Sequence, residues 1–127
     1  MRFIPTRVHG VLDYIMGLAL MAAPWLFRFN NNGPEMWIPV GLGAFVILYS
    51  LITDYEWGVA QGISMPAHLW LDGLGGLFLA ASPWLFGFED RVYLPHLIFG
   101  LGEFAAAMLT QTVPTRHPRF SFRERHV

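Results

Sequence analysis

The sequence predicts an all-α integral membrane protein, built as a four-helix bundle from two tandem helical-hairpin repeats. The first observation is composition, because 54% of the 127 residues are hydrophobic and 13% are charged, whereas soluble domains carry ~25% charged residues. The second is a set of four apolar stretches, each close to the length that crosses ~30 Å of hydrocarbon as a helix. They run over residues 8–28, 36–53, 67–87 and 92–112. Four such stretches leave too little polar surface for a soluble bundle, so the expected surroundings are the lipid bilayer.

An internal repeat is the third observation. The segment 9–29 aligns with 68–88, and 12 of 21 positions are identical. Continued without a gap, the same alignment pairs GLGAF at 41–45 with GLGEF at 100–104. The repeat unit is therefore a pair of helices. The expected units are 1–59 and 60–112, followed by a basic tail at 113–127.

The arginines predict the orientation of these helices. Two spans per unit give both units the same direction through the membrane. All eight basic residues are arginines, and six of them lie outside the outermost spans: Arg2, Arg7, Arg116, Arg119, Arg123 and Arg125. Because cytoplasmic segments are enriched in Arg and Lys, both termini are expected in the cytoplasm. The central loop, DYEWGVAQGISMP, should lie on the same side although it has no basic residue.

The motif Pro-Trp-Leu-Phe-x-Phe ends the first stretch of each unit. Proline removes a backbone donor and loosens the last helical turns, and aromatic side chains anchor helices at the membrane surface. We interpret the motif as a structural signal that ends the span, with a ligand role for the tryptophans as the alternative. The residues of this helix-end motif are Pro24, Trp25, Ser82, Pro83 and Trp84.

Two histidine–aspartate pairs occupy matching places in the repeats. His9 and Asp13 are four residues apart, as are His68 and Asp72, so each pair lies on one face of a helix. Ionisable groups within a span are costly and should point into the bundle. Three interpretations remain open: hydrogen bonds that lock the bundle, a relay for protons or cations, or a site for zinc, manganese or iron.

Glu103 is a single deep carboxyl group in the fourth stretch, where the gapless alignment of the repeats pairs it with Ala44. We expect it to point into the bundle or an oligomer contact, either as a structural carboxyl or as a group that handles protons or substrate. His96, near the outer end of the same stretch, is expected at the membrane interface rather than in a ligand set. The glycines of the two GxG steps should allow tight packing or a bend.

The segments HGVLDYIMGLALMAAPWLFRF and HLWLDGLGGLFLAASPWLFGF resemble the SPW repeat of small bacterial integral membrane proteins. The second copy has the full Ser82-Pro83-Trp84, whereas the first has Ala23 in place of the serine. The serine hydroxyl therefore cannot be needed in both halves. The resemblance implies paired transmembrane helices in the bacterial inner membrane. It implies no established reaction, so no catalytic residue can be assigned from it.

These observations favour a structural or accessory membrane component whose His–Asp pairs lock the bundle. The alternatives are a small transporter or proton-conducting protein, or a metal- or cofactor-binding redox protein, using His9, Asp13, His68, Asp72 and Glu103. The sequence has no nucleophile–base array or nucleotide loop, so we favour a non-enzyme, and it indicates no particular cofactor. A net charge of −1 argues against a nucleic-acid partner. A homo-oligomer or larger membrane complex is expected, because so small a chain leaves many small residues without an internal partner.

Overall fold

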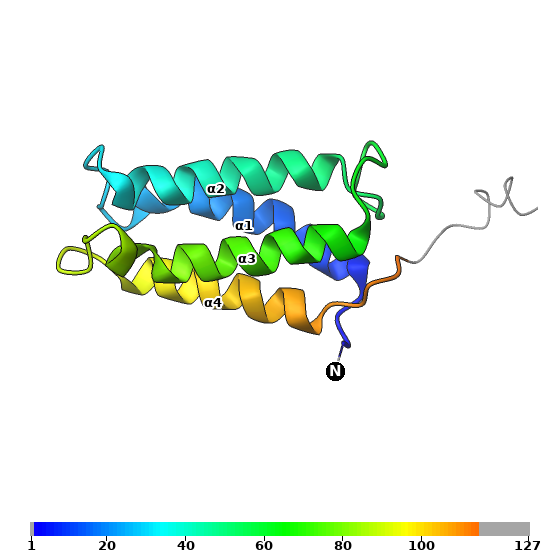
Figure 1. The fold of residues 1–127 in the computed structure, drawn as a ribbon. Coiled ribbons are helices and arrows are strands. Elements are labelled where there is room, and N and C mark those ends of the chain that lie inside the picture. Colours follow the sequence, from blue (N-terminus) through cyan, green and yellow to red (C-terminus); the bar gives the residue numbers. More distant parts are fainter. Residues whose placement is uncertain (1, 115–127) are drawn as a thin grey trace, which may run out of the picture.

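The computed structural model describes residues 2–114, which form four α-helices and no β-strand (Figure 1). Their bounds are α1 Thr6–Leu26, α2 Pro34–Leu51, α3 Met65–Leu85 and α4 Leu94–Leu109. The all-α prediction with four helices is confirmed. Most of the predicted basic tail, from residue 115 onward, lies outside the described residues. In the bundle α1 packs against α2 and α3 packs against α4, as the repeat requires.

The two hairpins are joined at their ends in a reciprocal way. The α1–α2 and α3–α4 connections lie at one end of the bundle, and the N-terminal segment and the α2–α3 connection lie at the other (Figure 1). Ile4, just before α1, forms a β-bridge with Thr110, just after α4. Ile63, just before α3, forms the matching bridge with Thr53, just after α2. Each repeat therefore closes against the other.

Glycines set the crossing point within each hairpin. A Cβ atom added at Gly43 of α2 would lie 2.5 Å from the carbonyl oxygen of Gly17 in α1. A Cβ atom added at Gly76 of α3 would lie 2.6 Å from the carbonyl oxygen of Gly100 in α4. Only glycine permits this backbone contact, so these four positions fix how the helices of each pair pack.

This crossing corrects the gapless alignment of the second helices. Gly43 and Gly100 hold the equivalent contacts, whereas the gapless alignment pairs Gly100 with Gly41. A Cβ at either of the other two glycines of the GxG steps, Gly41 and Gly102, would contact nothing within 4 Å.

The packing therefore defines a new register for α2 and α4, in which Gly43 pairs with Gly100. This register places Val46, rather than Ala44, opposite Glu103. The letters GLG match best in the gapless alignment, but packing selects a different glycine of this triplet in each repeat.

The helix-end motif turns the chain with a left-handed residue. Arg28 has φ 60° and Gly87 has φ 70°, and each follows the C-cap phenylalanine of its helix. The next phenylalanine, Phe29 or Phe88, donates its backbone N–H to the carbonyl of Pro24 or Pro83 at 2.8 Å. This hydrogen bond and the left-handed residue are typical of a Schellman helix end.

The last phenylalanine of each motif points back into the bundle. Phe29 and Phe88 are buried, whereas Trp25 and Trp84 remain about half exposed. Both phenylalanine rings contact the ring of His96, with centroids 5.1 Å and 4.9 Å away. His96, expected near the outer end of its helix, is buried because these rings cover it; its depth relative to a membrane stays a prediction.

Ser82 has a specific backbone partner. Pro83 has no N–H, so the carbonyl of Leu79, four residues earlier, loses its helical donor. The Ser82 hydroxyl donates to that same carbonyl at 2.7 Å. Ala23 cannot do this in the first repeat. The serine of the motif therefore repairs a gap in the helix that the proline creates.

Length and composition single out two of the four predicted spans within the described region. Both α1 and α2 are long and apolar enough to cross a membrane, and α4 is a shorter apolar helix.

Candidate functional site

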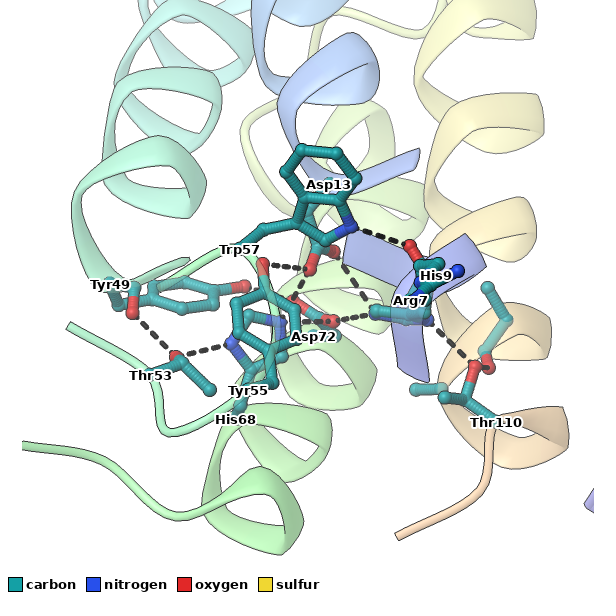
Figure 2. A network of polar contacts seen from close by, with 12 residues as sticks. Arg7, His9, Asp13, Tyr49, Thr53, Tyr55, Trp57, His68, Asp72 and Thr110 are labelled. Atoms are coloured by element: carbon teal, nitrogen blue, oxygen red, sulfur yellow. Dashed lines mark hydrogen bonds and ion pairs between the residues drawn. The ribbon is translucent and has the colours of Figure 1, made fainter. Parts of the chain in front are cut away.

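Four buried side chains from the first turns of α1 and α3 meet inside the bundle, near the end that holds the α2–α3 connection (Figure 2). We call His9, Asp13, His68 and Asp72 the quartet. Each residue can offer one ligand atom such that all four atoms lie within 4.8 Å of one another. All four residues are at most 1% exposed. The two predicted pairs are thus brought together into one site.

Each histidine contacts both aspartates. Nε2 of His9 lies 3.0 Å from Asp13 on its own helix and 2.7 Å from Asp72 on the other repeat. Nε2 of His68 lies 2.9 Å from Asp13 and 3.1 Å from Asp72. The contacts between repeats are as short as those within a helix, so the quartet joins α1 to α3.

Two threonines fix which nitrogen of each histidine faces the quartet. Nδ1 of His9 lies 2.7 Å from the hydroxyl of Thr110, and Nδ1 of His68 lies 2.7 Å from the hydroxyl of Thr53. Each threonine hydroxyl donates its hydrogen, at 2.6 Å, to the backbone carbonyl four residues earlier. Its oxygen must then accept from the histidine, so Nδ1 carries a hydrogen. Nε2 is left facing the carboxylates in both halves.

Two tyrosines complete the aspartate contacts, and both come from the first repeat. The Tyr49 hydroxyl donates to Asp72, and the Tyr55 hydroxyl donates to Asp13 at 2.9 Å (Figure 2). Burial and the nearby Asp13 carboxylate raise the pKa of Tyr55 above its ordinary value, so this hydroxyl stays a donor. The tyrosines make the surroundings of the quartet asymmetric.

The segment between α2 and α3 covers the quartet on the α1 side. Trp57 donates its indole N–H to the carbonyl of Arg7 at 2.8 Å, and its own carbonyl accepts from Tyr14 at 2.8 Å. A Cβ atom added at Gly10 would lie 2.3 Å from the Trp57 ring. The indole therefore lies directly against α1.

Sequence reasoning missed the threonines and tyrosines of the site. Thr110 is 101 positions from His9, and Tyr55 is 42 positions from Asp13. One signal was available, since the register that pairs Val46 with Glu103 also pairs Thr53 with Thr110. The gapless alignment concealed it.

Glu103 lies apart from the quartet. It is buried on α4, and its Oε2 atom has no hydrogen-bond partner among residues 2–114. It lines an apolar cavity together with Asp72. The structure thus places it near the site without a hydrogen bond that joins it to the four residues.

Comparisons with known proteins agree with the repeat. A family model, the SPW repeat domain, matches residues 7–110. The chain is also 32% identical over 88 residues to phosphoenolpyruvate carboxylase of Aeromonas hydrophila, a match that covers 67% of this chain and 10% of the enzyme. This chain thus spans about a tenth of the length of that relative. No solved structure matches it. The match over nearly all of the helical region shows that the chain belongs to the SPW repeat family.

Proposed function

We propose that the protein is a multi-pass membrane protein that holds one divalent transition-metal ion in the quartet. The membrane part is supported by an inverted distribution of polarity. Large apolar side chains are exposed on every helix, whereas buried polar groups gather inside. Exposed apolar residues include Ile15, Leu18, Phe45, Leu48, Trp70, Leu74, Ile98 and Leu101. Large exposed apolar areas are rare on soluble monomers, whereas lipid accommodates such side chains at no cost.

The single observation that carries the metal proposal is the convergence of two Nε2 atoms and two carboxylates. Histidine and carboxylate together suit zinc, manganese or iron. Metal-binding histidines commonly donate their other N–H to a fixed acceptor, which orients the ring. Thr53 and Thr110 provide such an acceptor in both halves. Two carboxylates would neutralise the charge of a dication in this buried place.

One nitrogen of the quartet lacks a directed hydrogen bond. Nε2 of His68 lies near both aspartates, but no group among the described residues is aligned to form a hydrogen bond with it. Buried polar atoms are normally satisfied. A metal ion among the four ligand atoms would satisfy this nitrogen and both carboxylates at once.

A structural lock is the second candidate. The hydrogen bond of 2.7 Å between His9 and Asp72 supports it, because it joins the two repeats directly. In that case both histidines would carry a proton on Nε2 and balance the two carboxylates. A relay through Glu103 has less support, since no hydrogen bond in the described chain joins Glu103 to Asp72.

Metal analysis separates these functions. The protein is purified in mild detergent without chelator, and its metal content is measured beside that of Asp13→Asn and His68→Ala. His96→Ala is the matched control, because His96 is equally buried but lies outside the quartet. We expect about one metal ion per chain, retained in the control and lost in the quartet variants, because each removes one of about four ligands.

A metal-free native protein that also takes up no added zinc, manganese or ferrous ion would contradict the metal proposal. The lock would then be supported if Asp13→Asn lowers stability by ~3–5 kcal/mol, the usual effect of breaking a buried ion pair. Loss of metal in His96→Ala as well would show that the variants simply unfold.

A further inference from the structure

A cavity opens between α2 and α3, and Leu20 of α1 and Glu103 of α4 complete its lining. It has a volume of about 270 Å³. Most of its lining is leucine, valine, phenylalanine and glycine, and its polar groups are Tyr49, Asp72 and Glu103. It exceeds a cavity of ~150 Å³ that holds one benzene molecule and falls just short of the ~300 Å³ at which pockets for drug-sized ligands begin. It has room for one ring with a short substituent.

Glu103 distinguishes this cavity from ordinary packing space. A buried carboxyl group without a partner is costly, yet Oε2 of Glu103 has none within the described chain. Glu103 is 7% exposed and belongs to the lining. The register set by Gly43 and Gly100 places the apolar Val46 at the equivalent position of the other repeat. Packing of this helix pair therefore does not require a carboxyl group here, and a ligand in the cavity could supply its missing hydrogen-bond partner.

The chemistry of the lining defines the ligand. The Tyr49 hydroxyl already donates to Asp72, so the few polar atoms of this largely apolar cavity are mainly acceptor oxygens of Asp72 and Glu103. A ligand that enters through lipid should be neutral, because charge is expensive in hydrocarbon. A hydroxyl group on an aromatic ring meets both needs, since it donates one hydrogen bond without carrying a charge.

We propose that this cavity binds a lipid-soluble aromatic alcohol of the phenol or hydroquinone class, with its hydroxyl group donating to Glu103. The inference goes beyond the metal site. It rests only on the proposed membrane location, through which the ligand arrives. Because Asp72 belongs both to the cavity and to the quartet, the ligand would lie next to the quartet.

Binding is tested by calorimetry on the whole protein in detergent, with 4-propylphenol and propylhydroquinone as probes. Propylbenzene is the matched probe without a hydroxyl group. We expect propylbenzene to bind at least about tenfold more weakly, the effect of one lost buried hydrogen bond. Glu103→Val should remove this preference, because it deletes the carboxyl group and introduces the side chain that the equivalent position of α2, Val46, carries.

Two glycine variants test the place of binding. A side chain at Gly75 would meet nothing within 4 Å and would project from the cavity lining, so Gly75→Leu should abolish binding. Gly102 is equally open but does not line this cavity, so Gly102→Leu should bind normally. A higher affinity for one probe would decide between a phenol and a hydroquinone.

Three results would overturn the proposal. Equal binding of propylbenzene and the alcohols would show a site for any apolar chain. Unchanged binding in Gly75→Leu would place the site elsewhere. The third result combines two measurements: the native protein binds no probe, and Gly75→Leu forms a smaller oligomer than the native protein. Together they would show that a second copy of the chain fills the cavity. Carbonate extraction of cell membranes tests the proposed membrane location. Because probe binding is measured in detergent, its result does not depend on the outcome of that extraction.

Discussion

At the scale of single residues, the two threonines are the least obvious parts of the site. Neither touches the carboxylates, yet each determines the hydrogen position on a histidine. The hydroxyl hydrogen is committed to a backbone carbonyl, so its oxygen can only accept. Both histidines are thereby held with a hydrogen on Nδ1. Nε2 faces the carboxylates, where it can carry a second proton or bind a metal ion.

We predict that Thr53→Val and Thr110→Val each weaken metal binding by ~10–100-fold, the usual effect of losing such a support. Valine keeps the shape of threonine but cannot accept the histidine hydrogen. Thr53→Ser and Thr110→Ser keep the hydroxyl group and should bind nearly as the native protein does. Competition with a chromophoric chelator measures the affinity, and equal affinities in the valine and serine variants would contradict the role of the hydroxyl.

At the scale of elements, the two copies of the helix-end motif differ at the position where the backbone is left-handed. Both copies place one residue in the left-handed region, with Arg28 in the first and Gly87 in the second. A side chain is unfavourable there, whereas glycine adopts this conformation freely. The first repeat is therefore under local strain that the second avoids.

Arg28→Gly should stabilise the protein by ~1 kcal/mol, because it relieves a left-handed residue, and Gly87→Ala should destabilise it by a similar amount. Thermal unfolding in detergent gives both values. Arg28→Ala keeps the Cβ atom and serves as the control for loss of the charged side chain. A gain in Arg28→Ala equal to that in Arg28→Gly would assign the effect to charge rather than backbone.

At the scale of the whole molecule, four helices in two like-oriented hairpins place the connections at opposite ends. The α1–α2 and α3–α4 connections share one end, and the α2–α3 connection lies at the other (Figure 1). Within the proposed inner membrane, the arginine-rich termini would lie in the cytoplasm together with the α2–α3 connection. This topology and the homo-oligomer stay predictions.

The chain has no cysteine, so single cysteines can map its topology without background. Asn31→Cys and Asp90→Cys lie in the two hairpin connections, and Gln61→Cys lies in the α2–α3 connection; all three positions are exposed. We expect a membrane-impermeant maleimide to label the first two on intact cells and Gln61→Cys only after permeabilisation. The reverse pattern would invert the topology, and equal labelling of all three would contradict a membrane-spanning bundle.

The sequence by itself determined the features that depend on local periodicity. The four helices, the repeat and the inward face that carries each His–Asp pair all follow from spacings of a few residues along one helix. His9 and Asp13 could be placed together because one helical turn separates them. The apolar composition predicted lipid surroundings; large leucine and tryptophan side chains are exposed in the structure, and the membrane location stays a prediction.

Only the tertiary structure decided how the two halves meet. The bond from His9 to Asp72 spans 63 positions, and the register of the second helices depends on which glycine meets its partner backbone. Such contacts arise from the packing of one helix on another, and no periodicity along a single helix encodes them. The same packing buries His96 between two phenylalanines and leaves Glu103 facing a cavity. The helices could therefore be predicted from the sequence, whereas the arrangement of the site could be seen only in the folded structure.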